Sequence, residues 1–543
     1  MFLGGKMNTG KDLWNKYCSF FEKSFSEQVK YNKQRLQEYF EKWKHTKTAQ
    51  HLCPGGVEKF EDVPLTTYED YPILHEFGKK IEKLEKTVPR EKGELWWDYY
   101  NRISKQVVPM LEGWLADEFS LCAKTTGTTG KNKWIVHGKE FWQNSATDMG
   151  TAVIFSASDK WGETRMEKGD TCLHLMAPVP YVSGYGFIAL QEDFEVFPPP
   201  EVVDNISDMR KKIWIALKAI KSGKKVDWVG GIASSLYLAC KYFTEPEKLF
   251  RDYYQSLNFG LAKLVSLLIW IRYKFGGKKY QKTKEIMPLK GLAIAGLDTK
   301  LYREMFKYEF EMEPLNVYAA TELGIVMLGR PDRKSDLMPN LRGRYLEFLT
   351  ESGEIKAIDN LKEGEVYEIV GTPFGSMLMR YKMGDLVRVI DFRNDGEPVF
   401  SFESRKSTLI DIYGYFRISE ATAIAALERA GLRNTDKWTI TKITEPNEQL
   451  LLLMEREWGY PENVATSLVF DALQEINEDF HNYVKDFKIK EPSQVIKVEY
   501  LKKGAFMRYT MKKVKEGTPL GQIKIPKIIP PDKWELVELL RRV

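Results

Sequence analysis

The chain has 543 residues, of which 43% are hydrophobic and 29% are charged, a composition typical of a folded soluble protein. A chain of this length exceeds what one hydrophobic core usually serves, so we expect roughly two to four domains. The 81 Lys and Arg residues exceed the 76 Asp and Glu residues by only +5, an excess too small to indicate a nucleic-acid partner.

Cysteines and histidines are scattered along the chain. The five cysteines are odd in number and lack the spacing of metal ligands, which predicts reduced thiols and a cytoplasmic location. The six histidines are equally dispersed, so the sequence predicts neither a zinc site nor a histidine-based triad. The most apolar run, residues 259–271, is shorter than the roughly 20 residues that a membrane span requires and is predicted to form a buried helix.

The first segments of the chain are predicted to be helical. Residues 11–47 carry apolar and aromatic side chains at helical spacing among many charges, which predicts one or two amphipathic helices. Residues 63–71 read VPLTTYEDY, with a proline turn and two hydroxyl residues before an acidic stretch. This pattern predicts the start of a helix.

A loop rich in glycine and hydroxyl residues follows at residues 125–133, which read TTGTTGKNK. Its glycines let the backbone turn freely, and its N–H groups, hydroxyls and lysines can surround a phosphate chain. The P-loop pattern fails at both ends, because Thr125 stands where it requires Gly and Asn132 where it requires Ser or Thr. The loop predicts a nucleotide site of another type, the alternative being an ordinary surface turn beside a lysine.

Short apolar runs then alternate with segments of helical period. Residues 172–182, 226–232 and 292–297 are predicted strands, and residues 300–310 are a predicted helix. This alternation indicates an α/β fold with a mostly parallel sheet and crossover helices.

The loop at 125–133 resembles the phosphate loop of the adenylate-forming superfamily, which includes acyl-CoA synthetases, luciferases and peptide-synthetase adenylation domains. That pattern is two hydroxyl residues, Gly, a hydroxyl residue, Thr, Gly, two variable positions and Lys. Later signatures of the superfamily are matched in order by NVYAATELG at 316–324, by RYKMGD at 380–385, and by Arg405 with Gly414 nine residues further on.

Two of these matches depart from the superfamily pattern. Met383 stands where the third signature usually has Thr, and we expect no effect because the loop geometry depends more on Gly384. Ser407 and Thr408 stand where two Asp residues usually follow the Arg of the fourth signature. The identity of the hinge residue is therefore open.

The resemblance implies a role for each matched residue. The residues implied to contact the nucleotide are Thr125, Thr126, Gly127, Thr128, Thr129, Gly130, Tyr318, Asp385 and Arg405. The residues implied to act in catalysis are Lys133, Thr321, Glu322 and Lys524, with Glu322 also the magnesium ligand. These types suit their tasks, because a flat ring covers a purine, a carboxylate accepts from two ribose hydroxyls, and Mg²⁺ prefers hard oxygen ligands.

The C-terminal part has a different pattern from the rest of the chain. We therefore place a domain boundary between residues 403 and 404. Residues 1–403 are predicted to bind ATP and the acid, and residues 404–543 are predicted to form a small domain. Ser419 is predicted to cap a helix, followed by strands at 438–443 and 450–454. A long helix at 461–484 and a strand at 494–500 complete an α+β pattern. The resemblance implies a large multi-layered first domain with mixed sheets and a small mobile α+β domain.

Two stretches resemble the plant auxin-responsive acyl-acid amido synthetases in particular: residues 63–71, which are also similar to phenylacetate CoA ligases, and residues 517–527, GTPLGQIKIPK. The Pro-Arg, Gly-Lys signature that ends most acyl-CoA synthetases is absent. Lys524 is therefore the candidate for the lysine that completes the adenylation site, with Lys527 second. The alternative for either is an ordinary solvated lysine.

The expected reaction uses Mg²⁺ and ATP to convert a carboxylic acid into an acyl adenylate and pyrophosphate. We expect transfer to the thiol of CoA, because residues 405–419 look closer to the phenylacetate CoA ligase hinge and a thiol is a strong nucleophile. The alternatives are the amine of an amino acid, the phosphopantetheine thiol of a carrier protein, and a non-catalytic nucleotide-binding scaffold. We expect no nucleic-acid partner and no membrane span, and the sequence fixes neither the acid nor the oligomeric state.

Overall fold

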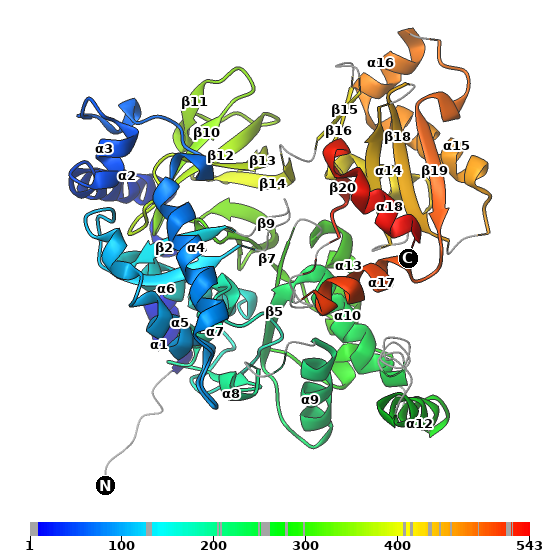
Figure 1. Cartoon of the computed structure of the whole chain (residues 1–543), viewed down its shortest axis with the longest axis horizontal. Helices are drawn as coiled ribbons and strands as arrows, with labels where there is room; N and C mark the ends of the chain where they lie inside the picture. The colour runs from blue at the N-terminus through cyan, green and yellow to red at the C-terminus, as the bar shows by residue number, and fades with distance from the viewer. Residues whose placement is uncertain are drawn as a thin grey trace. The chain divides into compact units, whose positions relative to one another are not determined.

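The computed structural model of the chain describes residues 9–542 except 126–132, 204–205, 207–208, 248–249, 251–260, 277–280, 297–298, 406–408, 413–415, 433–436, 445–446, 457–458, 487, 517–522 and 524 (Figure 1). The chain divides into two compact units. The first comprises residues 1–383 and 388–401, and the second comprises residues 384–387 and 402–543. The boundary that the sequence places between residues 403 and 404 stays a prediction.

Helices open the first unit, as the sequence predicts. They are α1 (Thr9–Cys18), α2 (Phe25–Trp43), α3 (Lys47–Leu52), α4 (Pro72–Thr87) and α5 (Trp96–Ser104). Helix α2 begins at a capping box, in which the Ser24 side chain accepts from the Glu27 N–H and the Glu27 side chain accepts from the Ser24 N–H. The predicted helix start near residue 67 is a short 3₁₀ turn, Tyr68–Asp70, after which α4 begins at Pro72.

A large sheet organises the rest of the first unit. Its strands are β3 (Thr171–Leu173), β4 (Glu195–Phe197), β5 (Trp228–Ile232), β6 (Gly291–Ala295), β7 (Leu315–Ala320), β8 (Gly324–Arg330), β9 (Arg333–Pro339), β10 (Arg344–Leu349), β11 (Ile355–Ala357), β12 (Val366–Pro373), β13 (Tyr381–Phe392) and β14 (Pro398–Arg405). The 12 strands follow the order β11-β10-β12-β13-β14-β9-β8-β7-β6-β5-β3-β4. Strands β4, β3, β5, β6 and β7 pair in parallel, whereas β7, β8 and β9 pair antiparallel. The predicted α/β class with mixed sheets is confirmed.

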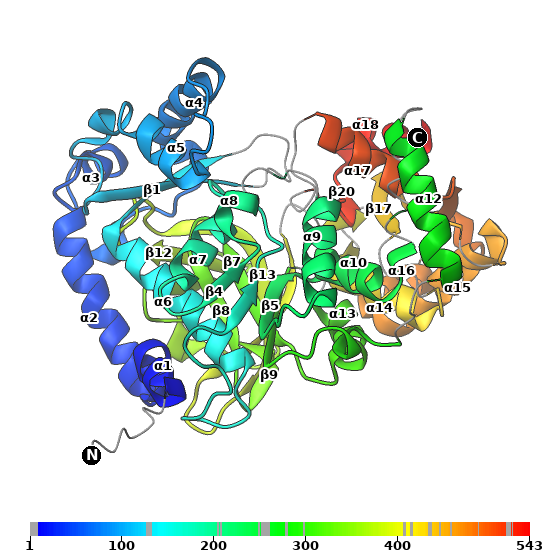
Figure 2. The ribbon, with the colours of Figure 1, turned by 90° about the horizontal axis from the view of Figure 1, so that it is seen from below.

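Helices cover both faces of the parallel half. The helices in this part of the chain are α6 (Lys139–Ser156), α7 (Val182–Leu190), α8 (Pro200–Val203), α9 (Met209–Lys221), α10 (Ala233–Thr244), α12 (Leu261–Gly276) and α13 (Thr299–Phe310). Figures 1 and 2 show α6 on one side of β5 and α10 with α13 on the other. Apolar residues of α6 share one buried core with residues of β5, β6, β7 and β8. The predicted strand at 172–182 is shorter than expected, because extended structure ends at Leu173 and a helix begins at Val182.

Helix α12 corrects one expectation, since it is not buried. Four large apolar side chains are substantially exposed: Leu264 (53%), Val265 (45%), Leu268 (59%) and Ile271 (43%). Apolar content alone predicted a helix there, but it could not show which neighbours would cover that helix. No helix among the described residues is both long and apolar enough to cross a membrane.

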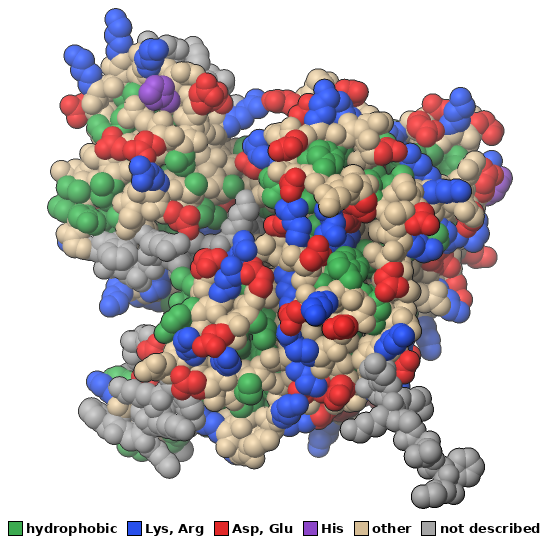
Figure 3. Space-filling model, turned by 180° about the vertical axis from the view of Figure 1, so that it is seen from behind, with side chains coloured by type: hydrophobic (Ala, Val, Ile, Leu, Met, Phe, Trp, Pro, Cys, Tyr) green, Lys and Arg blue, Asp and Glu red, His purple; other side chains and the backbone are tan. Residues whose placement is uncertain are grey.

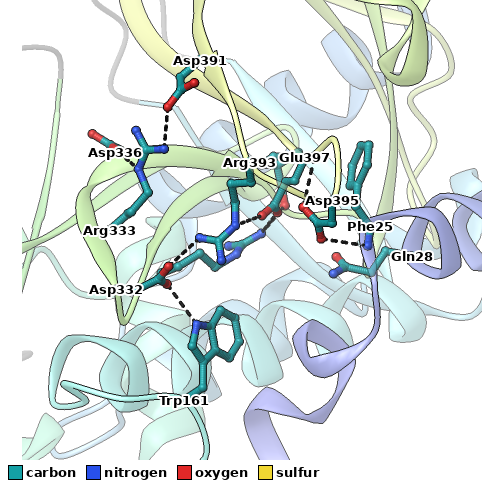
Figure 4. Close-up of polar contacts among 12 residues, drawn as sticks. Phe25, Gln28, Trp161, Asp332, Arg333, Asp336, Asp391, Arg393, Asp395 and Glu397 are labelled. Carbon is teal, nitrogen blue, oxygen red and sulfur yellow. Dashed lines mark hydrogen bonds and ion pairs between the residues drawn. The ribbon is translucent and has the colours of Figure 1, made fainter.

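Ion pairs join the hairpins at one end of the antiparallel half (Figure 4). Asp332, between β8 and β9, accepts hydrogen bonds from the Arg393 guanidinium and the Trp161 indole, each at 3.0 Å. Asp395, between β13 and β14, accepts from the Phe25 N–H at 3.2 Å, where α2 begins. This network ties both hairpins to earlier segments of the chain and so fixes the antiparallel half of the sheet.

The second unit has its own sheet and core. Its elements are β15 (Ile410–Ile412), β16 (Phe416–Ile418), α14 (Glu420–Arg429), β17 (Trp438–Ile443), β18 (Gln449–Glu455), α15 (Glu462–Ile476), α16 (Glu478–Asp486), β19 (Ile496–Leu501), α17 (Ala505–Lys515), β20 (Ile528–Ile529) and α18 (Trp534–Arg542). Four strands form the sheet β19-β18-β17-β20. Ser419 caps α14 as predicted, its hydroxyl accepting from the Thr422 N–H at 3.0 Å. The single helix predicted at 461–484 is instead two helices, which meet at Asn477.

Candidate active site

The loop predicted to bind phosphates closes a hairpin of two antiparallel strands, β1 (Phe119–Lys124) and β2 (Trp134–Gly138). The Thr125 N–H donates to the Lys133 carbonyl at 2.8 Å, and the Lys133 N–H donates to the Thr125 hydroxyl at 2.9 Å. These bonds fix the base of the loop and the point from which the Lys133 side chain leaves it. Outside the described residues lie Thr126, Gly127, Thr128, Thr129 and Gly130, so their phosphate contacts stay predictions.

Tyr68, which the motifs did not single out, supports the Lys133 side chain. The Lys133 Nζ lies over the Tyr68 ring, 5.2 Å from its centroid, at cation–π distance. The Tyr68 hydroxyl accepts a hydrogen bond from the Trp134 N–H at 3.3 Å, which ties the ring to the same hairpin. The only signal for Tyr68 in the sequence was the similarity of residues 63–71 to the amido synthetases.

The segment that carries Tyr68 pairs with the start of β13. The Thr66 N–H donates to the Arg380 carbonyl at 2.9 Å, and the Lys382 N–H donates to the Thr66 carbonyl at 2.8 Å. The Tyr71 hydroxyl accepts from the Met379 N–H at 2.8 Å. Two motifs separated by more than 300 residues therefore form one local structure.

Arg380, the first residue of the RYKMGD motif, is the centre of this local structure. Its guanidinium makes a bidentate pair with Glu347, at 3.0 and 2.8 Å, and donates to the carbonyls of Glu61 and Val63 at 2.6 and 2.7 Å. Its φ of 46° lies in the left-handed region that a side chain rarely adopts, so these contacts hold a strained backbone. Arg380 therefore has a structural role. The next residue of the motif, Tyr381, is the one that lies near Glu322.

His137 anchors the turn that carries Thr321 and Glu322, and no local pattern in the sequence singled it out. Its Nε2 lies 3.0 Å from the Thr321 carbonyl, and its Nδ1 lies 3.1 Å from the Ser376 hydroxyl. The ring stacks on Phe141, with 3.5 Å between centroids. Burial lowers the pKa of His137 to about 3, so the imidazole is neutral. Because a carbonyl only accepts, Nε2 carries the proton and Nδ1 accepts from Ser376.

Glu322 lies near Tyr68 and Tyr381, since its charge acts on the pKa of both. Burial raises the pKa of Tyr381, and the negative charge of Glu322 raises it further. The pKa of Tyr68 is raised to about 12, again first by burial, with a contribution from Glu322. The first unit therefore brings Lys133, Tyr68, Tyr381 and Glu322 together. Tyr318, the predicted adenine platform, lies on β7 and is largely buried, with Met327 of β8 opposite it.

The second unit contains two more predicted nucleotide contacts, and it pairs them with each other. The Arg405 Nε donates to the Asp385 Oδ1 at 2.9 Å. Asp385 is buried, whereas the Arg405 side chain is 37% exposed. Lys524 and Gly414 lie outside the described residues. Lys527, the second choice for the catalytic lysine, places its Nζ 4.9 Å from the centroid of the Trp438 ring.

Comparison with known proteins identifies the fold. Residues 337–405 match the central domain of the GH3 family. A structure of the AtGH3.15 acyl acid amido synthetase in complex with 2,4-DB aligns with a TM-score of 0.66 and 15% identity, covering 100% of this chain and 97% of that one. A structure of 2-hydroxyisobutyryl-CoA ligase in its postadenylation state aligns with a TM-score of 0.51 and 13% identity, covering 94% of this chain and 91% of the ligase. The chain has the fold of the adenylate-forming enzymes.

Among sequences, a jasmonoyl-L-amino acid synthetase (JAR6) of Nicotiana attenuata is 25% identical over 223 residues. The matched segment covers 38% of this chain and 37% of that relative, so the similarity spans well under half of its length. The resemblance to the plant amido synthetases is confirmed.

The described residues fit a magnesium ion of the kind that an adenylate-forming enzyme uses. No group of three His, Cys, Asp or Glu side chains that could hold a metal is found in the described part of the chain. Mg²⁺ commonly needs only one or two carboxylates, because substrate phosphates and waters fill its other positions. Glu322, on a turn anchored by His137, is one such carboxylate, and its role as the magnesium ligand stays a prediction.

Proposed function

We propose that the protein is an ATP-dependent ligase that adenylates a carboxylic acid and joins the acyl group to the amine of an amino acid. The observation that carries this proposal is the grouping of Lys133, Tyr68, Tyr381 and Glu322 within a fold shared along its whole length with an acyl acid amido synthetase. The predicted roles of Lys133, Thr321, Glu322 and the nucleotide-contacting residues are part of the proposal.

In the first step, an oxygen of the acid's carboxylate attacks the α-phosphorus of ATP. The bond from that phosphorus to the bridging oxygen breaks, and pyrophosphate leaves with the electron pair. Such phosphoryl chemistry depends mainly on positioning and on neutralising negative charge. Lys133, steadied over the Tyr68 ring, supplies a positive charge at the end of the phosphate loop.

Glu322 would hold a magnesium ion in this step. The ion would supply positive charge to the phosphate oxygens and orient the leaving pyrophosphate. His137 supports the position of Glu322 through the neighbouring Thr321 carbonyl, and as a neutral group it adds no competing charge.

In the second step, the amine nitrogen attacks the acyl carbon, the bond to the AMP oxygen breaks, and the ammonium proton is lost to a base. The sequence favoured CoA as the acceptor, and the relatives instead favour the amine. JAR6 is named as a jasmonoyl-L-amino acid synthetase, and the acyl acid amido synthetase aligns more closely over the whole chain than the CoA ligase does. The hinge segment that favoured CoA falls partly outside the described residues, at 406–408 and 413–415.

An amine acceptor requires a proton acceptor, and His75 is the candidate. Its ring centroid lies 4.4 Å from that of Tyr68, and its Nε2 lies 3.3 Å from a Glu69 carboxylate oxygen. An imidazole held in place by a carboxylate can take up a proton from the attacking amine. We include His75 in the proposal as the base for the second step.

The experiment that tests the first half-reaction is acid-dependent exchange of labelled pyrophosphate into ATP. We expect exchange with members of a carboxylic acid library, loss of exchange in Lys133→Ala and Glu322→Gln, and little change in Lys124→Ala. Lys124 is a matched control because it lies on the same hairpin with its Nζ over an aromatic ring, that of Trp134 at 5.3 Å. Absence of exchange with every acid in a folded protein would favour the non-catalytic scaffold.

A further inference from the structure

Helix α12 presents an apolar stripe that no described element of the first unit covers, and this feature is independent of the proposed reaction. In Figures 1 and 2, α12 lies beyond α10, apart from the strands of the large sheet. The exposed side chains are those of Leu264, Val265, Leu268 and Ile271. At about 100° per residue, these positions fall on one side of the helix.

The orientation of α12 is the reverse of that in an ordinary surface helix. Ser266, two residues from Leu264 and so on the opposite side, is only 6% exposed. A helix that packs on a protein core normally turns its apolar side inward and its polar side to water. In α12 a small polar residue faces the protein, and four large aliphatic residues face outward. A contiguous exposed apolar surface of this kind marks an interaction site.

The segment around α12 carries charge of one sign. Residues 253–284 contain no Asp or Glu, and they contain seven basic residues: Lys263, Arg272, Lys274, Lys278, Lys279, Lys282 and Lys284. Two of these, Lys282 and Lys284, pair with Glu311 at 2.8 and 2.6 Å. Over the face seen in Figure 3, by contrast, basic and acidic side chains are interspersed.

This charge decides between the two simplest occupants of the stripe. A second copy of the chain would bring two uniformly basic segments together, and like charges brought into contact oppose association. A bilayer with anionic lipids matches both features, because the headgroups attract Lys and Arg while the apolar side chains enter the acyl boundary. Trp270, with the Lys274 Nζ 5.5 Å from its ring centroid, adds an aromatic residue of the type enriched at that interface.

We propose that α12 docks the protein on the surface of an anionic membrane. Its 16 residues span about 24 Å at 1.5 Å per residue, too short to cross a bilayer, so the helix would lie parallel to the surface. Leu264, Leu268 and Ile271 would enter the membrane, and Lys274 would contact the headgroups.

The test is flotation of the full chain with vesicles of phosphatidylcholine and phosphatidylglycerol in a 7:3 ratio, compared with vesicles of phosphatidylcholine alone. We expect binding to the mixed vesicles only, weakened at high salt. Leu268→Asp and Lys274→Glu are each expected to reduce binding by about tenfold or more. Ile390→Asp is the matched control, because Ile390 on β13 is also a large exposed aliphatic residue, and it should bind as the parent does.

Three results would overturn the proposal. The first is failure of the parent protein to float with the mixed vesicles. The second is equal flotation of the parent and Leu268→Asp, with folding confirmed by circular dichroism. The third is a dimer in light scattering that Leu268→Asp converts to a monomer, which would assign the stripe to a second copy of the chain.

Discussion

Replacing His137 by phenylalanine tests how the turn with Thr321 and Glu322 is held. The substitution keeps a ring to stack on Phe141 and removes both side-chain hydrogen bonds. The partly buried Thr321 carbonyl then loses its donor, at a cost of about 1–3 kcal/mol, and the lost bond to Ser376 costs about 1 kcal/mol more. We expect the variant to lose about 2–4 kcal/mol of folding free energy, with weaker pyrophosphate exchange because Glu322 is less well positioned.

The same variant should change the pH dependence of stability. Burial lowers the pKa of His137 from its ordinary value to about 3, so below pH 6.5 the unfolded chain binds a proton that the folded chain does not. The stability contribution is therefore complete above about pH 6.5 and is lost progressively as the pH falls toward 3. Between pH 7 and pH 5 this single group accounts for a loss of about 2 kcal/mol, which the phenylalanine variant cannot show.

Urea unfolding at pH 7 and pH 5, followed by tryptophan fluorescence, measures both effects. His481→Phe, at an exposed position of α16, controls for the loss of a histidine elsewhere and should keep the parent's pH dependence. Identical stability losses on acidification in the parent and in His137→Phe would refute the view that His137 is the buried neutral anchor. Unchanged stability at pH 7 would refute the hydrogen-bond argument.

Three further predictions concern the proposed reaction. Asp385→Ala should weaken ATP binding by about 1.5–3 kcal/mol in isothermal titration, because it removes the acceptor of two ribose hydroxyls; unchanged affinity in a folded variant would contradict the ribose role. Lys524→Ala should impair adenylation far more than the reaction of a preformed acyl adenylate with its acceptor, and the choice is wrong if Lys527→Ala alone reproduces the defect. His75→Ala should slow amide formation from that adenylate, while pyrophosphate exchange continues; equal loss in both half-reactions would indicate a structural role.

Sequence reasoning singled out those parts of the proposed site whose chemistry demands certain residue types at fixed spacing. The loop at 125–133 and the segment 316–324 are recognisable because phosphate, purine and magnesium contacts each limit the choice of residue. Alternating apolar runs were enough to predict an α/β sheet. Strand ends were less certain, as at residues 172–182, where a helix begins inside the predicted strand.

The supporting residues could not be predicted, because their partners are distant in the chain. His137 bonds to Thr321 across 184 positions, and Arg380 bonds to Glu61 across 319. A histidine or an arginine at such positions carries no local pattern that reveals its partner. Helix α12 illustrates the same limit, since apolar content predicts a helix and burial depends on neighbours that periodicity does not specify.

The central claim is tested most directly by mass spectrometry of products formed from Mg·ATP, an acid library, and either mixed amino acids or CoA. The proposed function predicts N-acyl amino acids and AMP in the first mixture, with loss of both products in Lys133→Ala. Acyl-CoA in the second mixture, with no acyl amino acid in the first, would contradict an amine acceptor and restore the thiol that the hinge segment favoured.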